Sequence, residues 1–252
     1  MKTLFMAWQT KDKTRNWFPI GRLNVNQAGS EYTFEYTRGA QEALDHGFAP
    51  LLAFPDLKGR YTSSELFPLF QNRLLSKNRP EFKSYIQSMA ISDSVVFSPI
   101  EVLAVSGGER QTDSLQIFPK IELNSSGQFL TRFFVHGIRY LSGDSILRLA
   151  SLLPSERLNI SVENDNPKYP QAVKFHSNDD ILLGYSPRYL VNDLAKSIDS
   201  KICDIQANVV KVNGGDTPPN RKLLVEISGC YPKNVEPMSS DQYQPFTALT
   251  PH

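Results

Sequence analysis

The sequence predicts a β-rich α+β protein made of two domains. Short apolar runs of alternating polarity, such as Tyr32–Tyr36, are typical of half-buried strands. Aromatic residues make up 11% of the chain and prolines number 17, which favours short strands and tight turns over long helices. A chain of 252 residues is long enough to form two hydrophobic cores.

Residues 1–123 form the first predicted domain, a strand-rich module with helices. Apolar residues at helical spacing, with a proline in the first turn, indicate each helix, and paired glycines are typical of a helix end. Strands are expected at 4–8, 17–23, 32–36, 51–55 and 113–118. Helices are expected from Ser63 or Ser64 to about residue 75, from Pro80, and from Pro99 to Gly107–Gly108.

A turn-forming stretch, Asn124–Gly127, places a linker at 124–128, and the second domain covers 129–230. Asp144 is expected to cap one short helix and Ser186–Pro187 a second. The tail, 231–252, lacks periodicity and is expected to be flexible. Strands of the second domain are expected at 129–138, 158–162, 171–175, 181–185, 205–212 and 222–227.

The charge and cysteine content limit the possible functions. The net charge is +1, and acidic and basic residues also nearly balance within 129–230, so a nucleic-acid site must be a local patch. The two cysteines, Cys203 and Cys230, are expected to be reduced, buried thiols, and no Cys/His spacing suggests zinc. No apolar run approaches the ~20 residues of a membrane span. We therefore expect a soluble, cytoplasmic protein that needs no cofactor.

Three segments of the second half resemble the signatures of the HIRAN domain family. They are Gly137–Tyr140 (G-I-R-Y), Glu163–Val173 (E-N-D-N-P-K-Y-P-Q-A-V) and Gly184–Arg188 (G-Y-S-P-R). The signatures occur in the family's order and spacing, over about 129–230. The resemblance implies a small OB-like β-barrel with two short helices that binds single-stranded DNA or DNA ends.

The resemblance also implies which residues contact DNA. Arg139 would contact a phosphate, Tyr140 would stack on a base, Tyr185 would contact a base and Arg188 would reach the backbone. The family's Tyr-Asp pair, whose aspartate would accept a hydrogen bond from a 3′-hydroxyl, falls on Lys168–Tyr169. The implied nucleic-acid-binding residues are Arg139, Tyr140, Asn166, Lys168, Tyr169, Tyr185 and Arg188.

Each of these residues also has an interpretation without a ligand. Arg139 and Tyr140 are then a surface pair, Asn166–Pro167 is a turn, and Ser186–Arg188 only begins a helix. The stretch 58–83 holds six basic residues and two acidic ones. It is interpreted either as a solvated face or as a second strip that contacts phosphates.

The first half resembles, more loosely, the N-terminal subdomain of HipA-type kinases, over about 75 residues. The resemblance rests on Leu4–Trp8, Pro19–Leu23, Tyr32–Tyr36, Pro50–Pro55 and the helix residues Leu69–Leu75. The catalytic part of such kinases has no counterpart here, and the four histidines lie far apart, so no enzyme is expected.

Two hypotheses follow from these resemblances. The first is a non-enzymatic DNA-binding module that acts in DNA repair or in defence against foreign DNA. The alternative is a protein-binding adaptor, or an inhibitory subunit of a HipA-like kinase or toxin–antitoxin system. In that case a protein partner binds the first half or the tail.

Overall fold

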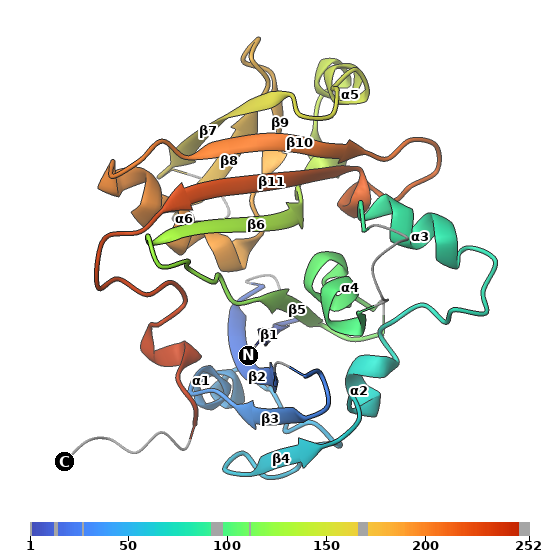
Figure 1. Ribbon diagram of the computed structural model, residues 1–252, viewed down its shortest axis with the longest axis vertical. Coiled ribbons are helices and arrows are strands. Elements are labelled where there is room, and N and C mark those ends of the chain that lie inside the picture. Colours follow the sequence, from blue (N-terminus) through green and yellow to red (C-terminus); the bar gives the residue numbers. More distant parts are fainter. Residues whose placement is uncertain are drawn as a thin grey trace. The chain divides into compact units, whose positions relative to one another are not determined.

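The computed structural model describes residues 2–12, 15–26, 28–91, 98–110, 112–165 and 171–246 (Figure 1). It confirms the predicted β-rich α+β class, with two antiparallel sheets. Its contacts divide the chain into two compact units, and neither unit is continuous in sequence. Unit 1 comprises Met1–Phe82, Val95–Lys120 and Met238–His252. Unit 2 comprises Lys83–Ser94 and Ile121–Pro237.

Unit 1 is built on a five-stranded antiparallel sheet with the strand order β4-β3-β2-β1-β5. Phe34, at the centre of β3, is completely buried, and its ring stacks on Phe54 with 4.0 Å between the centroids. The strands are β1 (Lys2–Gln9), β2 (Trp17–Val25), β3 (Tyr32–Tyr36), β4 (Arg60–Ser63) and β5 (Leu115–Pro119). The helices are α1 (Gly39–Asp45), α2 (Pro68–Gln71) and α4 (Pro99–Ser106).

Helix α4 confirms the sequence prediction at both of its ends. The Ser98 hydroxyl accepts a hydrogen bond from the Glu101 amide, and Pro99 occupies the first turn, where its missing N–H costs nothing. Gly107 ends the helix in the left-handed region, at φ 75°.

Other predictions for unit 1 were wrong. Residues 51–55 form turns, not a strand, since Phe54 is held in the core by ring contacts. The predicted helix over 63–75 is a single turn, α2, because Ser63 ends β4. The sequence did not reveal α1, which begins at a glycine: a Cβ on Gly39 would lie 2.2 Å from the Pro19 carbonyl oxygen, so close backbone approach requires this residue.

Part of the stretch predicted as a flexible tail, 231–252, packs into unit 1. The one-turn helix η3 (Asp241–Tyr243) places the Tyr243 ring edge-on against Phe5, with 4.8 Å between the centroids. The Phe246 amide donates to the Tyr36 carbonyl at 2.8 Å. Residues 238–246 are therefore part of unit 1, and residues 247–252 lie outside the described residues.

Unit 2 is built on a six-stranded antiparallel sheet with the order β6-β11-β10-β7-β8-β9, which curves into a half-barrel (Figure 1). Alternate side chains such as Val173 and Phe175 point into its core. The strands are β6 (Gln128–Phe134), β7 (Arg157–Glu163), β8 (Ala172–His176), β9 (Leu182–Tyr185), β10 (Gln206–Val212) and β11 (Leu223–Cys230). The helices are α3 (Phe82–Ser88), α5 (Gly143–Ala150) and α6 (Arg188–Ser200).

The predicted linker at 124–128 is a tight turn inside unit 2. The Asn124 amide donates to the Gln128 carbonyl at 2.9 Å, and Leu123 pairs with Phe129 across the turn. In this part of the chain, the boundary between unit 1 and unit 2 instead falls between Lys120 and Ile121.

The prediction of two reduced cysteines was wrong. Cys203, which follows α6, forms a disulfide with Cys230 at the end of β11. The two Cα atoms are 5.9 Å apart, in the usual range for a disulfide, and both residues are half-buried. The bond therefore ties the end of α6 to the last strand of the half-barrel.

Candidate nucleic-acid interface

The half-barrel closes at one point, where the chain after β6 meets β9. The amide of His136 donates to the carbonyl of Tyr185, and the amide of Tyr185 donates to the carbonyl of His136, each at 2.9 Å. Two segments that are far apart in sequence, 137–140 and 184–188, therefore lie next to each other.

The glycine in each of these segments is required by this junction. Gly137 has φ 80°, and a Cβ there would lie 2.9 Å from Cδ2 of the Tyr185 ring. Gly184 has φ 133°, and a Cβ there would lie 2.5 Å from the His136 carbonyl oxygen. At each glycine, the positive φ and the close neighbouring atom exclude a residue that has a Cβ.

The short helix η1 (Ile138–Tyr140) directs two side chains outward from this junction. Ile138 is buried and anchors the turn, while Arg139 is exposed and Tyr140 is 71% exposed. The guanidinium carbon of Arg139 lies 5.6 Å from the centre of the Tyr140 ring, within cation–π range. An outward aromatic ring beside a cation can stack on a base and contact its phosphate.

A row of side chains crosses the outer face of the barrel towards η1. Ser161 of β7 pairs with Lys174 of β8, which pairs with Tyr185 of β9. Directly paired residues share a face, so this face carries Lys174 next to Tyr185. The ammonium of Lys174 is held by Glu163 at 2.5 Å, and this hydrogen bond raises the pKa of Lys174.

Sequence reasoning missed Lys174 as part of this face. The signal was available, since Lys174 lies between buried Val173 and Phe175 and must point outward in a strand.

Arg188 is the first residue of α6 and is half-buried. The predicted cap, Ser186–Pro187, is confirmed in position, since Pro187 holds the cap position. The hydroxyl of Ser186 does not cap the helix, because it donates to the Pro187 carbonyl. The amide of Ser186 donates to the Val173 carbonyl at 2.9 Å, which fixes the start of α6 beside β8.

Three of the implied DNA-binding residues, Asn166, Lys168 and Tyr169, lie outside the described residues, in the sequence between β7 and β8. Arg73, from the possible basic strip of unit 1, is only 1% exposed and forms an ion pair with Asp113 at 2.6 Å. It is therefore not available to a surface phosphate.

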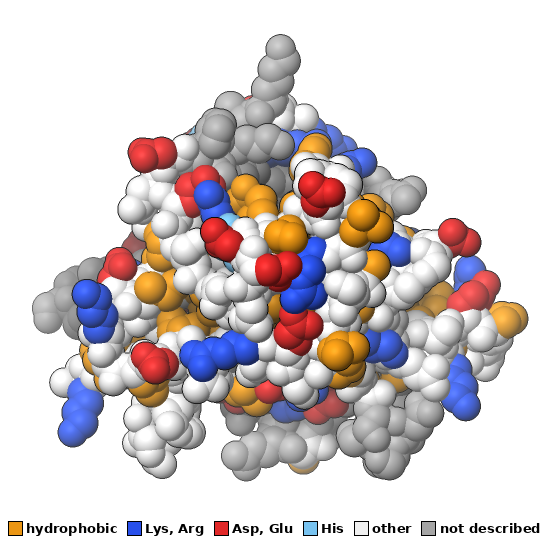
Figure 2. Space-filling view, turned by 90° about the horizontal axis from the view of Figure 1, so that it is seen from above, with side chains coloured by type: hydrophobic (Ala, Val, Ile, Leu, Met, Phe, Trp, Pro, Cys, Tyr) orange, Lys and Arg blue, Asp and Glu red, His pale blue; other side chains and the backbone are white. Residues whose placement is uncertain are grey.

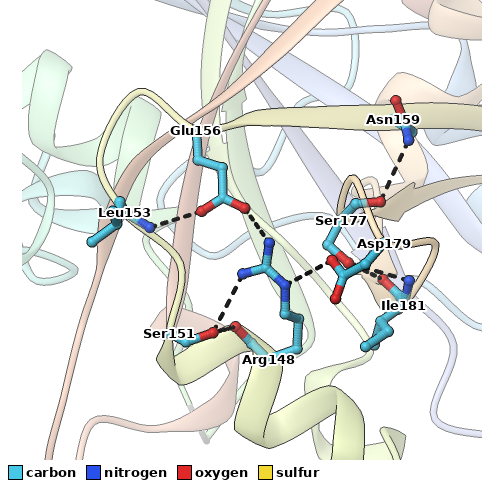
Figure 3. Close-up of polar contacts among 8 residues, drawn as sticks. All are labelled: Arg148, Ser151, Leu153, Glu156, Asn159, Ser177, Asp179 and Ile181. Atoms are coloured by element: carbon cyan, nitrogen blue, oxygen red, sulfur yellow. Dashed lines mark hydrogen bonds and ion pairs between the residues drawn. The ribbon is translucent and has the colours of Figure 1, made fainter.

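Helix α5 follows η1 directly, and an ion-pair network holds it to the barrel (Figure 3). Arg148 of α5 donates from Nε to Asp179 at 2.8 Å and from Nη2 to Glu156. Glu156 also accepts from the amide of Leu153 at 3.0 Å. Hydrogen bonds from Ser177 and Arg148 lower the pKa of Asp179 to about 2. The Leu153 amide and Arg148 also lower the pKa of Glu156.

The start of α5 differs from the prediction. Ser142, not Asp144, caps the helix, because its hydroxyl accepts from the Ser145 amide at 3.2 Å. Figure 2 shows acidic and basic side chains next to one another on the surface seen there, with apolar side chains between them. In unit 2 the exposed apolar side chains include Tyr140, Ile146, Leu147 and Leu153.

Within the described ranges, no group of acidic, histidine and cysteine side chains is arranged to hold a metal ion. No helix in the same ranges is both long enough and apolar enough to cross a bilayer.

The fold and the site define a partly closed antiparallel barrel that displays an Arg–Tyr pair at its closing point. Residues 128–228 match the HIRAN domain family. A HIRAN domain is generally a DNA-binding module and is not itself catalytic, which supports nucleic-acid binding by this chain.

Two solved structures are similar to part of the chain. A protein from Lactobacillus plantarum is 19% identical to this chain, with a TM-score of 0.33. The matched part covers 41% of this chain and 97% of that protein. The HIRAN domain of human HLTF is 19% identical, covers 42% of this chain and 81% of its own, and has a TM-score of 0.31. No curated protein sequence matches the chain. The likeness of unit 1 to HipA-type kinases stays a sequence-based prediction.

Proposed function

We propose that unit 2 binds single-stranded DNA through Arg139, Tyr140, Tyr185 and Arg188. The observation that carries this proposal is the pair on η1: an aromatic ring that is 71% exposed beside an exposed guanidinium. Both lie where the chain after β6 joins β9. The HIRAN match over residues 128–228 supports DNA as the ligand.

The chemistry of this surface suits a single strand better than a duplex. An unpaired base can lay its face on Tyr140, a contact worth about 1–3 kcal/mol per base. The surface needs few cations for this, in agreement with a net charge of +1. Ile138 is buried and the adjoining backbone is hydrogen-bonded to β9, so little conformational freedom is lost on binding.

Asn166, Lys168 and Tyr169 belong to the proposal through their likeness to the N-P-Y-D element of the family. Lys168 would contact a phosphate of the bound strand. The process that we propose for this activity is DNA repair or defence against foreign DNA.

Fluorescence anisotropy with a labelled oligonucleotide tests the proposal. The wild-type chain should bind the single strand more tightly than the duplex of the same sequence. Tyr140→Ala should weaken single-strand binding about five- to 150-fold, as the loss of one stacked base predicts.

Leu130→Ala is the matched control for Tyr140→Ala. It also shortens an exposed apolar side chain of unit 2, but on β6 and not on η1. It should leave binding unchanged. No binding by the wild type at low salt, or an equal loss in the two variants, would overturn the proposal.

A further inference from the structure

Helix α3 comes from the N-terminal half of the chain but, except for its first residue, belongs to unit 2. The side-chain amide of buried Asn213, which follows β10, donates to the carbonyl of Ser88 at 2.9 Å and to that of Arg221 at 2.8 Å. The ammonium of Lys211 donates to the Gln87 carbonyl at 2.6 Å. The last turn of α3 is therefore fastened to the connection between β10 and β11 (Figure 1).

This connection carries a second arginine–tyrosine pair. The guanidinium carbon of Arg221, at the end of η2 (Pro219–Arg221), lies 5.1 Å from the centre of the Tyr85 ring of α3. Both residues are half-buried, so each keeps part of its surface in solvent. Asn213 holds the Ser88 and Arg221 carbonyls, so the two backbone segments that carry the pair are tied together.

The second pair lies close to the first. Helix η2 packs against η1, and η1 carries Arg139 and Tyr140. Two arginine–tyrosine pairs therefore occupy neighbouring segments of unit 2.

The surroundings of the second pair are cationic. Residues 83–91 and 211–222 hold Lys83, Lys211, Arg221 and Lys222 against one acidic residue, Asp216. The ammonium groups of Lys211 and Lys222 each donate to one backbone carbonyl, and an ammonium group has three N–H donors. The local field therefore favours a polyanion, although the chain as a whole has almost no net charge.

We propose that a DNA strand bound at η1 continues across η2 to α3. Arg221 of η2 contacts a backbone phosphate of this strand, and Tyr85 of α3 holds the guanidinium of Arg221 in place. This inference rests on the proposed function and extends it, because α3 lies outside the matched residues 128–228. The protein then contacts a longer stretch of the strand than η1 and the barrel face could contact alone.

Two oligonucleotides, of about 4 and about 12 nucleotides, span the site sizes known for OB-type folds and separate the two contacts. Arg221→Ala should weaken binding of the longer strand about tenfold, the loss expected for one charge-assisted contact, and leave the shorter one unchanged. For the longer strand, the slope of log K against log salt should fall by about 0.7, the value for one phosphate contact on a single strand.

Two further variants and a control sharpen the test. Arg221→Lys keeps the charge and should keep the salt slope. Tyr85→Leu removes the aromatic face and should weaken binding of the longer strand. The slope of log K against log salt should then fall by less than it does in Arg221→Ala. Lys196→Ala removes an exposed cation from α6, elsewhere in unit 2, and should change neither affinity nor slope. Thermal unfolding of each variant shows that it is folded.

The extension is overturned if Arg221→Ala leaves the affinity and salt slope of the longer strand unchanged while Tyr140→Ala weakens both strands. Equal weakening of both strands by Arg221→Ala also overturns it, since Arg221 would then act through η1. If the wild type binds neither strand, the proposed function fails and the extension fails with it.

Discussion

His136 and Tyr185 exchange both of their backbone hydrogen bonds, and this pair joins the chain after β6 to β9. The pair lies beside Gly137, whose left-handed backbone starts η1 and turns Arg139 and Tyr140 outward. Closure of the barrel and presentation of the candidate site are therefore one structural feature.

Gly137→Ala tests this feature. The new Cβ would lie 2.9 Å from the Tyr185 ring, at a backbone φ of 80°. We expect the free energy of unfolding to fall by about 1–3 kcal/mol, the usual cost of such strain, and DNA binding to weaken with it. Urea unfolding measures the first effect and anisotropy the second.

Gly143→Ala is the control, because Gly143 is the first residue of α5 and a Cβ there meets nothing within 4 Å. It should leave stability unchanged or raise it slightly. Equal effects of the two substitutions would contradict the steric argument at Gly137.

The Arg148 network predicts that the protein loses stability in acid. The folded-state pKa of Asp179 is lowered from 3.8 to about 2, and that of Glu156 is also lowered. A lowered carboxyl pKa contributes stability above its unfolded value and loses it as pH falls through the folded value. The melting temperature should therefore fall between about pH 4 and pH 2.

Arg148→Met removes the cation and keeps a long apolar stem, so its melting temperature should depend less steeply on pH over this range. Thermal unfolding monitored by circular dichroism at successive pH values measures both proteins. Parallel pH profiles for the wild type and Arg148→Met would show that the network does not carry this dependence.

The Cys203–Cys230 disulfide should contribute to the stability of unit 2. It joins residues 27 apart in sequence, and a loop of that size predicts about 3.5 kcal/mol from the restricted unfolded chain. The double variant Cys203→Ala, Cys230→Ala should unfold at lower urea concentration than the oxidised wild type. A thiol titration of the native protein that finds two free cysteines would contradict the pairing.

Local sequence signals predicted a part of the fold. Ser98, Pro99 and Gly107 fix both ends of α4 through short-range chemistry, and the three HIRAN-like segments predicted the barrel. The class of fold followed from alternation and turn residues.

Long-range pairing explains most of what the sequence did not reveal. The disulfide depends on the spatial approach of Cys203 and Cys230, which no local pattern encodes. The contacts of Tyr243 with Phe5, and of Asn213 with Ser88, join segments that are distant in sequence, so the units could not be read as continuous ranges. The outward direction of the Lys174 side chain could be predicted from the alternation along its strand. Its place beside Tyr185 depends on the register between β8 and β9, which the alternation does not give.

The substitution at Lys168–Tyr169 leads to a prediction about strand ends. If Lys168–Tyr169 takes the place of the family's Tyr-Asp pair, the site lacks the aspartate that would accept a hydrogen bond from a 3′-hydroxyl, and Lys168 adds a cation. The protein should then bind 3′-hydroxyl and 3′-phosphate ends about equally, or prefer the phosphate. Competition between the two oligonucleotides measures this, and a strong preference for the hydroxyl would show that another residue accepts that bond.

The salt dependence of single-strand binding by the wild type and Arg139→Ala tests the central claim most directly. Anisotropy titrations at several salt concentrations should show that the wild type binds single-stranded DNA and that its affinity falls as salt rises. Arg139→Ala should weaken binding and reduce the slope of log K against log salt by about 0.7, the value for one phosphate contact on a single strand. Arg132→Ala, which removes an exposed arginine of β6 that is paired with Glu226, should leave both unchanged. Wild-type binding that is absent at about 50 mM salt, or a slope that Arg139→Ala does not alter, would contradict the account.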